Sequence, residues 1–135
     1  MRGRKPDLQA IEGGLASVPR APAWLPTEAK EEWKRVLPSL IKRRILTAAD
    51  MGTVENYCLA AGTIRRCQVT IATEGDTVET KEGSKRHPAF QTLGQMMTEH
   101  RRLAAELGLT PTSRNKAGKP PDGEDGYDAY ADLGI

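Results

Sequence analysis

Residues 27–64 read TEAKEEWKRVLPSLIKRRILTAADMGTVENYCLAAGTI, and two amphipathic patterns share this stretch. In the first pattern, apolar residues recur at i, i+3, i+4, i+7 and i+8, which predicts a helix over about 27–43. Thr27 suits the N-cap of this helix, and Pro38 should kink the helix or split it in two. The apolar stripe expected to be buried consists of Trp33, Val36, Leu37, Leu40 and Ile41.

A second helix is expected to follow after a short turn. Thr47 and Asp50 are three positions apart, which predicts a capping box at the start of the helix. The helix should reach about residue 73 and end before Gly75. Leu59 lies off its apolar stripe, so the back of the helix is expected to make a contact of its own. The stripe itself reads Met51, Val54, Tyr57, Cys58, Ala61 and Ile64.

The remaining pattern predicts a turn or a short β-hairpin, followed by a third helix. Residues 76–86 carry a strand signal over 77–80 and a turn signal at 82–83. The third helix should begin with Pro88 at its first position and end at Gly108, with a further helical turn near 110–112. The expected stripe of the third helix is Phe90, Leu93, Met97, Leu103, Ala104 and Leu107. The predicted fold is therefore all-α, with three main helices whose first pair is helix-turn-helix-like.

Charge divides the 135-residue chain into three parts. We expect residues 1–22, which include several Gly and Pro residues, to form a flexible basic arm, and residues 23–113 to form a helical domain for DNA binding and oligomerisation. We expect residues 114–135 to form a disordered acidic tail. Residues 1–117 hold 19 Lys and Arg against 13 Asp and Glu, a net +6, whereas residues 118–135 hold 1 against 5, a net −4. This separation predicts a polyanion as partner of one part and a protein as partner of the other.

Several chemistries have no support in the sequence. Gly118-Lys119 is followed by Pro120, so it is no phosphate-binding loop. Cys58 and Cys67 are nine positions apart on one predicted helix, hence on opposite faces, and cannot share a metal ion. His100 falls in an apolar stripe, and His87 is expected to shape the entry of the third helix. We expect no catalytic residue, no cofactor and no metal site.

Duplex DNA is the polyanion that the basic residues fit best. Three cations lie beside the N-terminus of the second helix, where free N–H groups favour phosphate, and two more follow along it. No aromatic pair suggests a platform for single strands. The alternative interpretation is ordinary solvated charge. The predicted DNA contacts are Arg2, Arg4, Lys5, Lys42, Arg43, Arg44, Arg65 and Arg66.

The tail combines acids with a few apolar residues. Tyr127, Tyr130 and Leu133 are expected to dock on a protein partner; the alternative is a tail that only improves solubility. No stretch approaches the ~20 apolar residues of a membrane span. We therefore expect no membrane contact and a reducing cytoplasm as the location.

The order of several short motifs resembles a family. The motifs are Gly3-Arg4-Lys5-Pro6, Pro22-Ala23-Trp24-Leu25, Ala29, Trp33, Leu46-Thr47, Asp50, Gly75, His87-Pro88, Glu106-Leu107-Gly108-Leu109-Thr110-Pro111 and Arg114. This ordered set, over about residues 1–116, resembles the small subunits of phage terminases. The resemblance implies a non-enzymatic, ring-forming homo-oligomer in the cytoplasm of the bacterial host. It also implies binding of viral double-stranded DNA and regulation of a large subunit that carries the ATPase and nuclease.

Three other functions remain open on the residues alone. A small helix-turn-helix transcription regulator of a phage or bacterium would bind a palindromic site as a dimer. A structural adaptor would bind protein and no DNA. A metal-dependent nuclease would need clustered carboxylates, which the sequence does not show.

Overall fold

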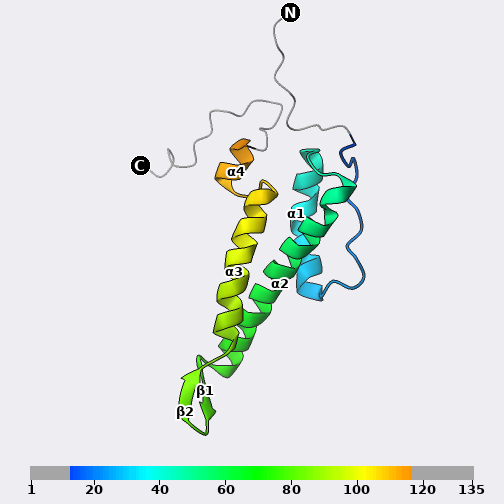
Figure 1. The fold of residues 1–135 in the computed structure, drawn as a ribbon. Coiled ribbons are helices and arrows are strands. Elements are labelled where there is room, and N and C mark those ends of the chain that lie inside the picture. Colours follow the sequence, from blue (N-terminus) through cyan, green and yellow to red (C-terminus); the bar gives the residue numbers. More distant parts are fainter. Residues whose placement is uncertain (1–12, 117–135) are drawn as a thin grey trace, which may run out of the picture.

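The computed structural model describes residues 13–116, and these form a mostly helical domain (Figure 1). The arm residues Arg2, Arg4 and Lys5 and the tail residues Tyr127, Tyr130 and Leu133 lie outside the described residues. In chain order the elements are α1 (Thr27–Lys42), a 3₁₀ turn (Ala48–Asp50), α2 (Met51–Glu74), β1 (Thr77–Thr80), β2 (Gly83–Arg86), α3 (Ala89–Glu106) and α4 (Pro111–Lys116).

Helix α2 is the central element, because α1 and α3 both pack against it (Figure 1). Its buried residues therefore occupy more than one face. Cys58 and Cys67 lie on opposite faces of the helix, and both are buried free thiols. All five residues of the stripe predicted for the first helix are buried, which confirms that helix. The core consists of these five with Leu25, Ala29, Leu46, Val54, Tyr57, Cys58, Ala104 and Leu107.

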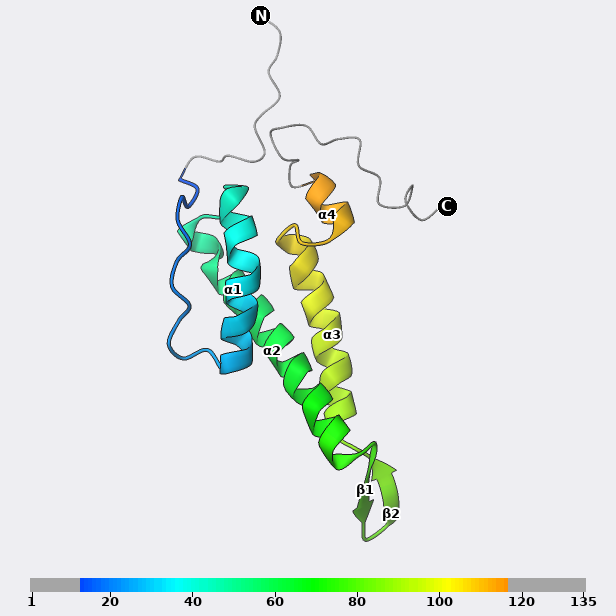
Figure 2. The same cartoon turned by 180° about the vertical axis from the view of Figure 1, so that it is seen from behind.

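A strap of chain, residues 13–26, runs along the outer side of α1 (Figure 2). The backbone N–H of Leu15 donates to the Leu46 carbonyl at 2.8 Å, and the Trp33 indole N–H donates to the Pro19 carbonyl at 3.0 Å. Leu15 also packs against the core. The described part of the expected arm is thus held against the helical domain by specific contacts.

Helix α1 differs from expectation at two positions. The N-cap is Pro26, so Thr27 is the first helical residue instead of the cap. Pro38 does not split the helix, which runs unbroken from Thr27 to Lys42. Pro38 itself is exposed, while Leu37 and Leu40 beside it are fully buried. Burial of these neighbours offsets the hydrogen bond that proline cannot donate, and the helix continues through it.

The start of α2 confirms the predicted capping box. The Asp50 carboxylate accepts the Thr47 backbone N–H at 2.7 Å, so the acid reaches back to the cap as a capping box requires. The first turn is 3₁₀, and the α-helix proper begins at Met51 and ends before Gly75, whose φ of 91° only glycine adopts readily. The back of the helix does make a contact, since Leu59 packs partly buried against the core.

The predicted β-hairpin is present at the far end of the α2–α3 pair (Figures 1 and 2). Its antiparallel register pairs Thr77 with Arg86 and Thr80 with Gly83. His87 fixes its junction with α3, as expected for the helix entry. The imidazole Nδ1 accepts the Ala89 backbone N–H at 3.0 Å, and Nε2 lies 2.9 Å from the Glu74 carboxylate. Because Nδ1 accepts, Nε2 carries the proton and donates to Glu74.

Helix α3 begins one residue later than predicted, with Pro88 as N-cap. Its expected stripe is only partly buried, because Met97 is 52% exposed and Ala104 is the one buried residue within the helix. The reason is that, among the described elements, α2 is the one long helix that packs extensively against α3, so much of the α3 surface stays uncovered. Gly108, with φ of 72°, ends the helix, and the predicted restart is α4.

Candidate nucleic-acid interface

The end of α1 carries three consecutive cations. Lys42 is the last helical residue and is exposed. Arg44 is also exposed and has a φ of 54°, an uncommon backbone conformation for a residue with a side chain. Its N–H donates to the Ile41 carbonyl at 2.9 Å, which closes the turn. Two of the three cations predicted here therefore face solvent.

Arg43, the third, is tied to the opposite helix. One guanidinium nitrogen, Nη1, donates to the Gly108 carbonyl at 2.6 Å, and the other, Nη2, is buried without a partner among the described residues. Burial, together with the nearby charge of Arg114, lowers the pKa of Arg43. Arg43 thus connects the end of α1 to the end of α3, and only part of its charge is available to a ligand.

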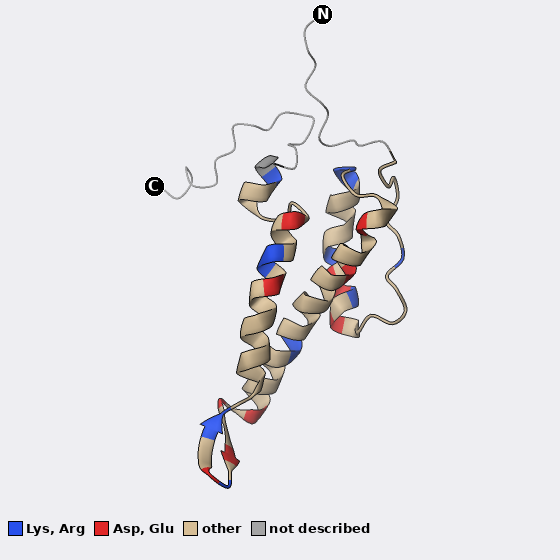
Figure 3. Cartoon of the chain, in the orientation of Figure 1, with Lys and Arg blue, Asp and Glu red and all other residues tan. Residues whose placement is uncertain are grey.

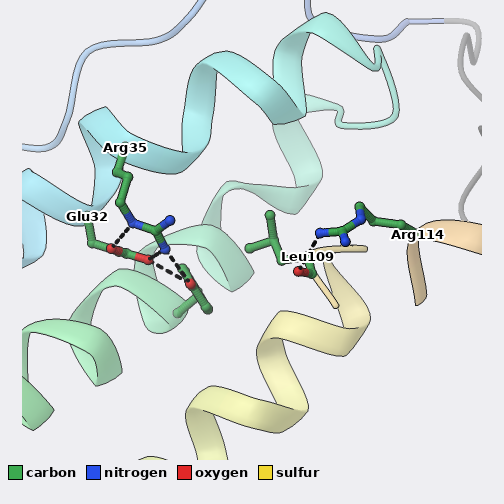
Figure 4. Close-up of polar contacts among 5 residues, drawn as sticks. Glu32, Arg35, Leu109 and Arg114 are labelled. Carbon is green, nitrogen blue, oxygen red and sulfur yellow. Dashed lines mark hydrogen bonds and ion pairs between the residues drawn. The ribbon is translucent and has the colours of Figure 1, made fainter. Parts of the chain in front are cut away.

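The fold brings a further cation to this end of the molecule. Arg114 of α4 donates from Nη1 to the Leu109 carbonyl at 3.3 Å and points back toward the end of α3 (Figure 4). Figure 3 shows that α4 and the end of α1 lie at the same end of the structure. Arg114 was named among the family motifs but was not predicted as a DNA contact, because 70 positions separate it from Arg44 in the sequence. We call Lys42, Arg43, Arg44 and Arg114 the basic end.

Arg65 and Arg66 lie elsewhere. They are 15 and 16 positions beyond Asp50, which places them roughly 20 Å along the α2 axis from the basic end. Both are exposed, and Arg66 makes only a long 3.4 Å contact to the Thr63 hydroxyl. Within the described part of the chain, the predicted DNA contacts therefore fall into two separate regions.

A polar cluster between α1 and α2 was not predicted at all. Glu32 forms an ion pair with Arg35, with a 2.8 Å bond from Nε, and accepts the Tyr57 hydroxyl at 2.6 Å (Figure 4). His100 of α3 stacks on Tyr57 with ring centroids 4.7 Å apart. Tyr57 and His100 were assigned to apolar stripes, and nothing in the spacing indicated that Glu32 lies opposite them.

The cluster has shifted acidities. Burial raises the pKa of Glu32, but hydrogen bonds from Arg35 and Tyr57 outweigh burial and leave it below its ordinary value. Burial and then the bond to Glu32 raise the pKa of Tyr57, and burial lowers the pKa of His100. The cluster thus holds the Glu32 carboxylate ionised beside the neutral Tyr57 phenol. We interpret it as a hydrogen-bonded cluster that stabilises the fold.

A groove of about 450 Å³ opens beside this cluster. Arg35, Arg65, Gln68 and His100 give it polar walls, and Met97 contributes an apolar one. Within residues 13–116, no three His, Cys, Asp or Glu side chains gather in a way that would hold a metal ion. The same residues include no helix long and apolar enough to cross a membrane.

The protein is thus a small helical protein with the basic end as its cation-rich surface. Its described residues form no cluster that could bind a metal ion. A family model described as phage terminase, small subunit, matches residues 29–124. The chain therefore belongs to the phage terminase small subunits, as the order of its motifs had indicated. No curated protein and no solved structure matches it.

Proposed function

We propose that this terminase small subunit binds duplex DNA through the basic end during genome packaging. The membership of residues 29–124 in the family is the observation that carries the proposal. The exposure of Lys42 and Arg44, with Arg114 close by, supports it physically, because each cation that meets a phosphate releases a counterion.

The contacts proposed here are to the DNA backbone. Residues 51–64 of α2 include no Lys or Arg, although a helix-turn-helix geometry would assign base recognition to that helix. The cations flank its N-terminus instead. We therefore retain the helix-turn-helix-like pair as a way of positioning phosphate contacts, to which Arg65, Arg66 and the arm residues Arg2, Arg4 and Lys5 add further charge.

The role proposed for the chain is non-catalytic. A separate large subunit would supply the ATPase and nuclease in the host cell, and Tyr127, Tyr130 and Leu133 are the proposed contacts to it. Several copies would form a homo-oligomeric ring, so that weak contacts sum over identical subunits. Exposed apolar side chains away from the basic end, Val69 at 58% and Met97 at 52%, support self-association.

A titration of duplex DNA at several salt concentrations tests the DNA contact. Lys42→Glu with Arg44→Glu should weaken binding and reduce the salt slope by about 0.9 for each phosphate that the protein no longer neutralises. The matched control is Lys81→Glu with Lys85→Glu, which changes the charge equally in the exposed hairpin. Equal affinity of both double variants at low salt would contradict the proposal. Light scattering with and without DNA measures the oligomeric state separately.

A further inference from the structure

A second groove, distinct from the basic end, lies between the strap and α1. Its volume is about 700 Å³, and its apolar wall comes from Val18, Pro19, Ala21, Ala23, Trp33 and Pro38. The bond from the Trp33 indole to Pro19 fixes the strap against α1, so the groove is preformed. The Val18 side chain, which lines this groove, is 48% exposed to solvent.

The charge around this groove has one sign. Arg20, Lys30 and Lys34 line it, and no Asp or Glu does. None of the three cations forms an ion pair within residues 13–116. An apolar groove edged only by cations fits an acidic segment that carries apolar side chains.

The chain contains such a segment. Residues 122–135 hold five acids, Asp122, Glu124, Asp125, Asp128 and Asp132, and no base, which gives −5. Tyr127, Tyr130 and Leu133 recur among them at intervals of three. No stretch of similar length among the described residues has this combination of uniform negative charge and regularly spaced large apolar residues.

The connection is long enough. Residues 117–126 span at most about 33 Å when extended. The end of α1 contacts the end of α3 through the bond from Arg43 to the Gly108 carbonyl. Helix α4 follows directly after this point. Lys34 is nine positions before Arg43, which corresponds to roughly 14 Å along α1. The extended span exceeds this axial distance by roughly 19 Å, which is enough for the chain to pass around α1, a helix about 10 Å across, to the strap on its outer side (Figure 2). The groove is therefore within reach of Tyr127 of the same molecule.

We propose that the acidic segment, residues 122–135, docks in the groove between the strap and α1 of its own chain. The apolar side chains of the segment occupy the wall around Trp33, and its acids face Arg20, Lys30 and Lys34. This docking requires neither DNA nor a large subunit, so it stands or fails independently of the proposed function. It makes the groove a competitor of any other protein that binds the same segment.

Disulfide formation in the full-length chain tests the docking. Val18→Cys with Leu133→Cys places one thiol in the groove and one in the segment. The matched control is Val69→Cys with Leu133→Cys, since Val69 is also an exposed valine but lies on α2. The native Cys58 and Cys67 stay in place, because both are buried and burial raises the pKa of Cys58 to about 12, which keeps it unreactive.

With oxidised glutathione, we expect the groove pair to form an intrachain disulfide at least ~10-fold faster than the control pair, because docking raises the effective concentration. Adding Lys30→Glu and Lys34→Glu should remove most of this difference, whereas Lys81→Glu and Lys85→Glu should not. Circular dichroism verifies that each variant is folded. Equal rates for both pairs overturn the proposal. Disulfides that form only between differently tagged copies also overturn it, and assign the groove to contacts between copies.

Discussion

Gly62 of α2 lies so close to Ala29 of α1 that a Cβ atom on residue 62 would be 2.8 Å from the Ala29 backbone nitrogen. The same atom would be 3.2 Å from the Ala29 Cα. Both residues are buried, so neither helix backbone can move aside into solvent. The crossing of α1 over α2 is therefore set by the absence of a side chain at one position.

Gly62→Ala is expected to destabilise the protein. The overpacking cost is about 1–3 kcal/mol, and it exceeds the gain of up to ~1 kcal/mol that alanine brings to a helix interior. Urea unfolding followed by circular dichroism measures the difference. Gly52→Ala is the control, because a Cβ at that exposed position meets nothing within 4 Å and should stabilise the helix. Stabilisation by both substitutions would disprove the close crossing.

Mutations at Arg43 and Arg44 should have different effects on stability. Arg43→Ala removes the bond to the Gly108 carbonyl and should cost roughly 1–3 kcal/mol. Arg44→Gly relieves the left-handed backbone and should leave stability unchanged or raised by up to ~1 kcal/mol. Thermal unfolding of both variants is the measurement, with Lys42→Ala as the neutral reference. A larger loss for Arg44→Gly than for Arg43→Ala would contradict these assignments.

Tyr57→Phe should weaken the α1–α2 contact. The substitution removes the hydroxyl that donates to half-buried Glu32 and should cost about 1–2 kcal/mol. Chemical unfolding at neutral pH measures this loss. In a double-mutant cycle with Glu32→Gln, the double variant should lose less free energy of unfolding than the two single variants added together, because both substitutions act on one hydrogen bond. Strict additivity would show that the pair does not interact.

Stability should decrease in acid through Glu32. Its pKa is lower in the folded protein than the ordinary value of 4.5, so the unfolded chain takes up the proton first as pH falls. The stabilisation is therefore complete above about pH 4.5 and is lost as the pH falls through the folded-state pKa. Unfolding midpoints between pH 7 and pH 3 should show a smaller acid loss for Glu32→Gln than for the native chain. Parallel curves would exclude Glu32 as a contributor.

His87→Ala should loosen the hairpin. The variant leaves the Ala89 N–H without its acceptor and breaks the link to Glu74. Amide hydrogen exchange should become at least several-fold faster over residues 77–86, while α1 keeps its protection. His87→Asn is the control, because a short side-chain oxygen at a helix entry can accept the same N–H. Uniform acceleration over the whole chain would instead indicate global unfolding.

Local rules predicted the local structure well. The stripe from Trp33 to Ile41, the capping box at Thr47 and the glycine ends at Gly75 and Gly108 all depend on residues within a few positions of one another. There were three local exceptions. Thr27 and Pro88 each lie one position away from their predicted place at a helix start, and Pro38 does not split its helix, because burial of its neighbours offsets the missing donor. Sequence patterns within a few residues are sufficient to predict those features that depend only on neighbouring residues.

Contacts between distant residues were not predictable in this way. Nothing around Glu32 indicates a tyrosine 25 positions later, and nothing around Arg43 indicates a carbonyl 65 positions later. Met97 fits the helical period but faces solvent, because periodicity shows which residues share a face and not whether another element covers it. The grooves are likewise products of assembly, since their walls come from separate segments.

The β-hairpin has a consequence for sequence variation. Apart from half-buried Val78, the side chains of β1 and β2 are exposed, and the two strands lie beyond the end of the α1–α2 contact (Figure 1). Substitutions there leave the core packing intact, so the folding cost of changing them is small. Natural selection can therefore change the surface of this tip, residue by residue, without changing the helices that carry it.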